Sequence, residues 1–153
     1  MALHHIYLII HLLTATIWVG GHLILVIGFL PKALKNNDFS YIQKFEKTYE
    51  PIGMPSLLLL VITGILMAYN FGSGIGTWFS FSSSIETVVS LKITCLLISV
   101  CFAISAQTRV LPQLRKGNIK KLPEMAFHII SVTTLGVIMV ILGSFVRYGG
   151  INL

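Results

Sequence analysis

Charged side chains are scarce in this sequence. They make up 10% of its 153 residues, whereas soluble domains average about 25%. This scarcity excludes an ordinary soluble domain. Hydrophobic residues make up 55% and gather in windows long enough to cross a ~30 Å hydrocarbon core, which takes ~20 residues. Four such windows run approximately from Leu3 to Leu30, Ile52 to Phe71, Glu86 to Gln107 and Leu122 to Val146. We expect an all-α, integral membrane four-helix bundle that forms a single domain over residues 1–153.

Cysteines are also few, which excludes a disulfide framework. The two present, Cys95 and Cys101, are six residues apart in the third window. On a helix they are therefore separated by ~120° and cannot chelate an ion from one face. We interpret both as small packing residues. The sequence also lacks a nucleophile–base arrangement, a phosphate-binding glycine loop and a tetrahedral zinc cluster.

Basic residues are missing before the first window and between residues 72 and 85. A first segment without a basic start is not a cleavable signal peptide, so we expect it to remain as the first helix. The net charge of +6 comes from two connections, which contain Lys32, Lys35, Lys44 and Lys47, and Arg109, Arg115, Lys116, Lys120 and Lys121. The positive-inside rule places both connections in the cytoplasm and both termini outside. The membrane that we expect is a bacterial inner membrane. The charge therefore indicates topology rather than nucleic-acid binding, and a basic patch for lipid or a partner stays open.

The first basic connection contains an amphipathic segment over residues 38–49. Asp38 is a plausible N-cap, and Phe39, Ile42 and Phe45 recur at helical spacing. We expect a short helix on the membrane surface that ends at Pro51, where the second spanning helix starts.

A faint repeat relates the two halves of the chain. Leu30-Pro31 follows the first window, and Leu111-Pro112 follows the third. A duplicated helical hairpin would explain this repeat. His11 and Lys92 each lie twenty residues before the corresponding proline, so the repeat predicts that they share a depth near the outer face.

Histidines mark the first window. His11 and His22 are eleven residues apart, so on a helix they share one face at a separation of ~16 Å, with Trp18 on the same stripe. An imidazole inside a membrane is costly unless it has a partner, which makes both residues candidate ligands at two depths. A hydrogen bond between helices is the alternative for His11, and packing is the alternative for Trp18. His4 and His5 are expected at the membrane interface.

The fourth window adds His128 and, eleven residues later, Met139. The predicted topology brings His22 and His128 to one inner level, and His11, Met139 and Lys92 to one outer level. Imidazole and thioether groups are axial haem ligands, and helix bundles hold cofactors between facing side chains. The alternatives are gap filling for Met139 and a side chain that reaches the surface for Lys92. Arg147, near a helix end, is an anchor or a partner for a haem propionate.

Several runs together resemble the short members of the copper-resistance D membrane family. They are His11-Leu-Leu-Thr-Ala-Thr-Ile-Trp-Val-Gly-Gly-His22, Leu30-Pro31, Tyr49-Glu-Pro-Ile-Gly-Met-Pro55, Thr63-Gly64, Leu91-Lys92, Arg109 with Leu111-Pro112, Phe127-His128 and Phe145-Val-Arg-Tyr-Gly-Gly150. The chain is more distantly similar to the four-helix protoporphyrinogen oxidases of the bacterial haem pathway. That second resemblance implies a b-type haem, with His11 and Lys92 at the family's functional positions. His22 and the ending after Phe127 fit the copper-resistance group better.

Together these observations predict a membrane protein that binds haem b through His22 and His128, with a second haem or porphyrin at His11 and Lys92 left open. Its expected role is redox: electron transfer through the membrane, or oxidation of a porphyrinogen or quinol. Whether it is an enzyme stays open; if it is one, it is an oxidoreductase of these types. The alternative is a copper carrier for transport or resistance, which would use His11, His22, His128 and methionines. Expected partners are lipid, a quinone, porphyrinogen or other redox partner, and a second copy in a homodimer.

Overall fold

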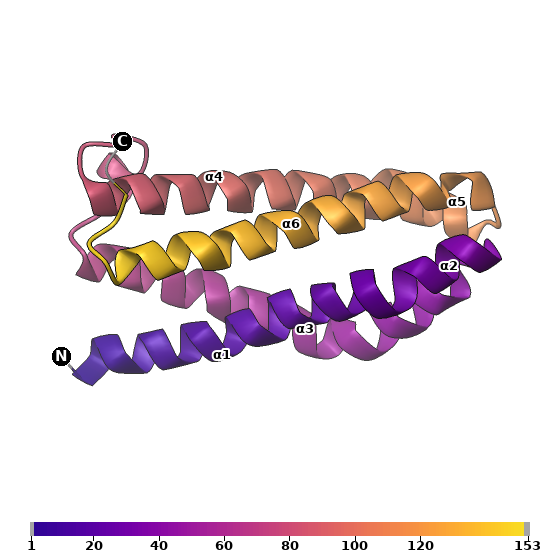
Figure 1. Cartoon of the computed structure of the whole chain (residues 1–153), viewed down its shortest axis with the longest axis horizontal. Helices are drawn as coiled ribbons and strands as arrows, with labels where there is room; N and C mark the ends of the chain where they lie inside the picture. Colours follow the sequence, from indigo (N-terminus) through magenta and orange to yellow (C-terminus); the bar gives the residue numbers. More distant parts are fainter. Residues whose placement is uncertain (1, 152–153) are drawn as a thin grey trace.

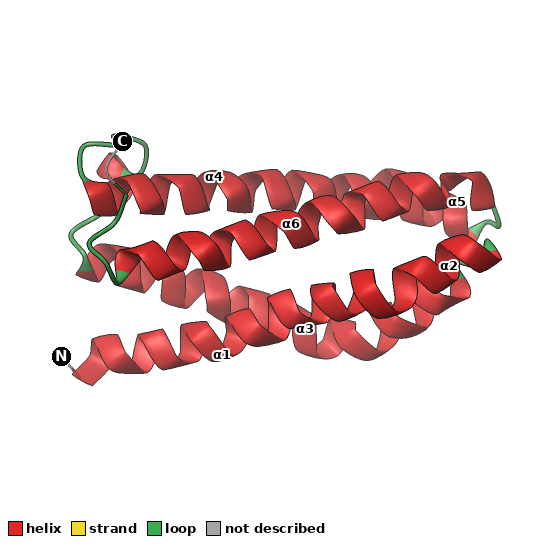
Figure 2. Cartoon of the chain, viewed as in Figure 1, coloured by secondary structure: helices red, strands yellow, loops and turns green. Residues whose placement is uncertain are grey.

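The fold is a bundle of four long helices, seen in a computed structural model that describes residues 2–151 (Figures 1 and 2). The helical elements, in chain order, are α1 (Ala2–Ile24), η1 (Leu25–Phe29), α2 (Leu30–Asn36), α3 (Ser40–Asn70), η2 (Ile75–Thr77), α4 (Ser84–Ser105), η3 (Ala106–Val110), α5 (Leu111–Arg115), η4 (Ile119–Lys121) and α6 (Leu122–Val146). They form four apolar rods, each long enough to span a membrane: Leu3–Asn36, Ser40–Asn70, Ser84–Arg115 and Ile119–Val146. The predicted all-α membrane bundle and its four windows are confirmed.

The outer surface of the bundle is apolar along its length. Large side chains such as Ile27, Leu13 and Phe127 are 74%, 60% and 60% exposed. Lipid tails are as apolar as these side chains, so such exposure carries no cost in a bilayer. The spanning helices therefore have lipid-facing surfaces.

The four rods pair into two antiparallel hairpins, α1 with α3 and α4 with α6 (Figure 1). The hairpins meet each other mainly along α1 and α6. Both termini and the loop before α4 lie at one end of the bundle, and α2 and α5 lie at the other, which we call the α2–α5 end. The predicted basic connections are at the α2–α5 end.

Each hairpin has a π-helical turn at the same place in its first rod. In η1 the N–H of Leu30 donates to the carbonyl of Leu25, and in η3 the N–H of Leu111 donates to the carbonyl of Ala106. Each turn directly precedes a Leu-Pro pair, where proline lacks an N–H and its ring crowds the preceding turn. The same irregularity at the same motif supports the duplicated hairpin.

The amphipathic segment differs from its expected form. It is the first part of α3, which continues through Pro51 and Pro55 instead of ending there. Its N-cap is Phe39 rather than the predicted Asp38, which lies one residue earlier and accepts hydrogen bonds from the N–H and hydroxyl of Ser40, both at 2.8 Å. These bonds hold the pKa of Asp38 below its usual range.

The apolar face of this segment is buried in protein rather than on the membrane surface. Phe39 and Ile42 are 6% and 2% exposed, in a cluster with residues of α2, α5 and α6. Side chains of the neighbouring helices cover the face that the sequence alone would assign to lipid headgroups. This cluster joins the two hairpins at the α2–α5 end.

Candidate functional site

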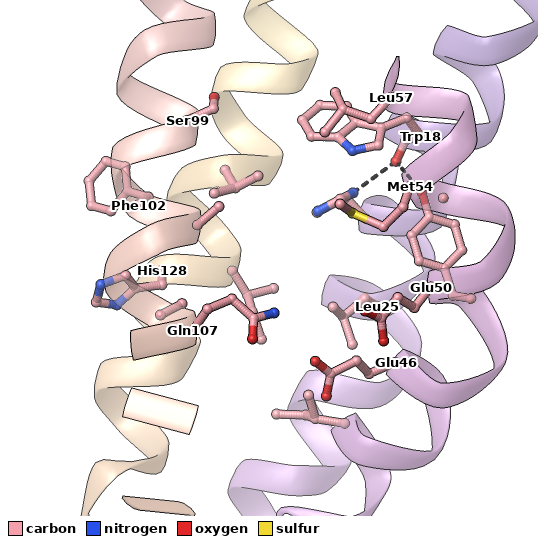
Figure 3. Close-up of a pocket in the computed structure, with 18 of the residues that line it drawn as sticks. Trp18, Leu25, Glu46, Glu50, Met54, Leu57, Ser99, Phe102, Gln107 and His128 are labelled. Carbon is pink, nitrogen blue, oxygen red and sulfur yellow. Dashed lines mark hydrogen bonds between the residues drawn. The ribbon is translucent and has the colours of Figure 1, made fainter. Parts of the chain in front are cut away.

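A cavity of about 230 Å³ lies between the two hairpins, in the half of the bundle nearer the α2–α5 end. Its walls come from α1, η1, α3, α4, η3 and α6. Trp18, Met54 and Leu57 line the α1–α3 side, facing the α4–α6 side across the cavity (Figure 3). Both π-helical turns contribute to its lining, and such turns occur frequently at functional sites.

His22 presents a free ring nitrogen at this cavity. Its Nδ1 is 2.8 Å from the carbonyl oxygen of Trp18, one turn earlier on α1. A carbonyl oxygen only accepts, so Nδ1 must carry the proton and Nε2 must carry the lone pair. Within the part of the chain that the structure describes, Nε2 has no hydrogen-bond partner. The helix itself therefore holds the imidazole in the tautomer that can bind a metal.

His128 also lines the cavity but is satisfied within its own hairpin. Its Nδ1 donates to the carbonyl of Glu124 at 2.7 Å, and its Nε2 accepts from the hydroxyl of Ser105 at 3.0 Å. Its ring points away from Trp18 and lies edge-on to Phe102 (Figure 3). Among the described residues, no hydrogen bond or ring contact joins His128 to His22. The structure thus brings the predicted inner pair to one cavity, with only His22 ready to bind.

His11 is bound to the neighbouring helix instead of facing the cavity. Its Nδ1 is 3.0 Å from the hydroxyl oxygen of Thr63, and that hydroxyl donates to the carbonyl of Leu59. The Thr63 oxygen therefore accepts a hydrogen bond from Nδ1–H of His11, which leaves the lone pair on Nε2. The ring packs on Gly64, where a β-carbon would be 3.1 Å from its Cε1.

Lys92 lies on the other hairpin, against α6. Its Nζ is 3.4 Å from the position that a β-carbon on Gly143 would occupy. Neither an ion pair nor a hydrogen bond is found for Lys92 among the described side chains. Among the described residues, no hydrogen bond joins Lys92 to His11, and the shared depth that the repeat predicts stays a prediction.

The other predicted site residues, Trp18, Met139 and Arg147, lie where packing or anchoring accounts for them. Trp18 is 6% exposed and packs against α6 at Gly136, and Met139 packs in the same cluster. Packing, the alternative interpretation, thus describes the contacts of both. Arg147 is exposed directly after α6, where an anchor is expected.

Sequence reasoning missed several polar residues of the cavity. Glu46 and Glu50 lie one turn apart on α3, and Gln107 extends from η3 toward Glu46 (Figure 3). The spacing of the two glutamates was a usable signal, but it was hidden in a segment interpreted as a surface helix. Tyr49 and Met54 also line the cavity.

Ser99 lines the cavity with a buried hydroxyl that has no hydrogen-bond partner among the described residues. The residue is 4% exposed. Ser90 and Thr94 on the same helix instead donate to carbonyls one turn back. A buried hydroxyl without a partner is costly unless a ligand or water satisfies it, and Ser99 lines the cavity.

Comparison with family models, with curated proteins and with solved structures finds no match for this chain.

The residues that line the cavity are compatible with a haem. The described residues contain no group of three or more His, Cys, Asp or Glu side chains that could hold an ion together. The cavity offers the oriented imidazole of His22 within apolar walls that include Leu25, Leu57, Ile129 and Val132, and its lining also includes Glu46, Glu50 and Met54. A porphyrin supplies four iron ligands of its own, so it needs from the protein only axial ligands and an apolar pocket.

Proposed function

We propose that this chain is a membrane redox protein that binds b-type haem between its two hairpins, with His22 as an axial ligand. The observation that carries the proposal is the His22 ring, whose Nδ1–H is held by the Trp18 carbonyl. Metal-binding histidines usually donate their second ring N–H in this way, which orients the ring and raises the basicity of the ligating nitrogen. Haem supplies the one-electron chemistry when bound.

His128 is our candidate for the second axial position. It lines the same cavity, and its Nδ1–H is held by the Glu124 carbonyl just as that of His22 is held by Trp18. To bind iron, its Nε2 must lose the hydrogen bond that it accepts from the hydroxyl of Ser105. The cavity of about 230 Å³ is also smaller than the ~300–1,000 Å³ of typical ligand pockets, so binding requires the hairpins to move apart. Such movement is feasible because the hairpins meet mainly along α1 and α6.

A copper carrier is the second candidate, and one feature favours it. The thioether of Met54 and the carboxylates of Glu46 and Glu50 line the same cavity as His22. Thioether and imidazole suit copper, and the cavity volume is ample for an ion. In this alternative the protein would move copper without redox turnover.

The absorption spectrum and metal content of the purified protein separate the two functions. Haem binding predicts a Soret band, sharp reduced α and β bands and stoichiometric iron. A colourless preparation with stoichiometric copper would overturn the haem proposal in favour of the carrier. A preparation without either metal would overturn both.

We further propose that the protein lies in a bacterial inner membrane with the α2–α5 end in the cytoplasm, because both predicted basic connections are at that end. A reporter active only outside the cytoplasm should give signal when fused at Ser73 and none when fused at Lys116. The reverse pattern would show that the orientation is inverted.

The outer level at His11 and Lys92 is the proposed place for a second haem, or for a porphyrinogen or quinol as substrate. An unpaired ammonium inside a membrane calls for an anion, which a propionate can supply. Lys92→Met should therefore lower tetrapyrrole content or its oxidation while leaving the His22 spectrum intact, and Lys92→Arg should partly restore the loss. The matched control is Lys35→Met, which removes an exposed lysine of α2. Equal behaviour of the two methionine variants would show that Lys92 only extends to the surface.

Partner proteins are part of the same proposal. A redox protein of this size needs an electron donor or acceptor, and a homodimer would place the lipid-facing side of one bundle against another.

A further inference from the structure

The hydroxyl of Tyr49 on α3 forms hydrogen bonds with α1 beside His22. The Oη of Tyr49 donates to the carbonyl of Trp18 at 3.0 Å, with the carbonyl of Ile17 at 3.1 Å. The Trp18 carbonyl is the same one that accepts the Nδ1–H of His22. A single oxygen atom therefore links the candidate haem ligand on one helix to a tyrosine on the next.

The ring of Tyr49 is held where only glycine leaves room for it. A β-carbon on Gly21 of α1 would collide with this ring, and one on Gly53 of α3 would come within 2.5 Å of it. A β-carbon built on the neighbouring Gly20 would have no atom within 4 Å. Phe45 stacks on Tyr49 with a centroid distance of 5.2 Å.

The ring is also in contact with the imidazole itself. Tyr49 and His22 are edge-to-face, with centroids 6.1 Å apart and planes at 89°. Trp18 packs on the imidazole at 4.6 Å. His22 is thus held by two aromatic rings and by one carbonyl that it shares with the hydroxyl of Tyr49.

We propose that Tyr49 is a positioning residue for His22. Its ring, which lies against Gly21 and Gly53, sets the position of the imidazole. Its hydroxyl shares the Trp18 carbonyl and so weakens the hydrogen bond that His22 Nδ1–H donates to this oxygen. Two donors on one carbonyl oxygen each form a weaker bond than one donor alone. The bond at Nδ1 sets how basic the opposite nitrogen is, and axial-ligand basicity tunes the potential of a bound haem. The tuning part of the inference rests on the proposed function, whereas the positioning part does not.

The positioning part is tested without haem, by NMR of protein labelled with ¹⁵N in its histidine rings. His22→Gln assigns the signals of His22 by their disappearance. The wild type should show His22 protonated at Nδ1. Tyr49→Phe keeps the ring but removes the hydroxyl, so the Nδ1 proton should move to lower field as its remaining bond strengthens.

Gly21→Ala and Gly20→Ala form a matched pair for the ring. A methyl group at Gly21 displaces Tyr49 and its hydroxyl, so the ring signals of His22 should shift away from their wild-type positions, whereas Gly20→Ala should match the wild type. If Gly21→Ala does not fold, Tyr49→Phe decides the question alone. Unchanged His22 signals in Tyr49→Phe, and in Gly21→Ala if it folds, would overturn the inference.

The tuning part is tested by redox titration of haem-loaded protein. Tyr49→Phe should lower the midpoint potential, because a more basic imidazole stabilises ferric iron. A shifted NMR signal with an unchanged potential would show that Tyr49 positions His22 but that His22 does not ligate the haem. A preparation that never contains haem overturns the proposed function and leaves the NMR result to stand by itself.

Discussion

Replacement of His22 by alanine is expected to abolish the spectrum of haem bound between the hairpins. The variant loses the ring whose Nε2 is free at the cavity and whose tautomer is held by Trp18. Loss of an outer partner of a ligand already costs ~10–100-fold in metal affinity, and loss of the ligand itself should cost more. Absorption spectroscopy and haem content per protein measure this effect. His5→Ala is the matched control, because it removes an exposed imidazole near the end of the same helix.

The second axial position has its own pair of variants. His128→Ala should convert the haem from six-coordinate low spin to five-coordinate high spin. Ser105→Ala, which removes only the partner of His128 Nε2, should keep the low-spin spectrum. Wild-type reduced spectra in both histidine variants would show that neither ring is a ligand.

Gly136→Leu is expected to lower the free energy of unfolding by about 1–3 kcal/mol, the usual cost of an overpacked contact. A β-carbon at Gly136 would already be 3.2 Å from the Trp18 ring and 3.5 Å from Val19. Larger atoms would push α6 away from α1, where the two hairpins meet. Thermal unfolding measures the loss, and tryptophan emission in a Trp78→Phe background reports whether Trp18 becomes exposed to lipid.

The control for this contact is Gly20→Leu, because Gly20 has open space around it. Both substitutions place the same side chain in a spanning helix, so they share any general effect on insertion. Equal melting temperatures for the two variants would show that the hairpins are not held together at Gly136.

The four spans could be predicted from the sequence because their signal is local. A run of apolar residues long enough to cross a membrane is visible without any knowledge of neighbours. The repeat was also visible, since a Leu-Pro pair marks each π-helical turn. The end of the surface helix at Pro51 was predicted wrongly, because α3 continues through this proline, as spanning helices do where their surroundings satisfy the freed backbone groups.

Part of the candidate site was predictable from the rise per residue of an α-helix, which gives the relative heights of side chains along a helix. It placed His22 and His128 at one level, and both line the cavity. It did not show that Nε2 of His128 is occupied by Ser105, since that contact depends on how α4 is rotated against α6. The glutamates of α3 were missed for the same reason: which face of a helix meets a cavity is decided by its neighbours.

The sequence by itself therefore determined the all-α architecture and the number of spans, because these follow from helix length and hydropathy. Only the tertiary structure decided that Nε2 of His22 is free, that the hydroxyl of Ser99 has no partner among the described residues, and that Tyr49 shares a carbonyl with His22. These properties depend on distances of about 3 Å between residues far apart in the chain, and hydrogen bonds weaken steeply outside that range.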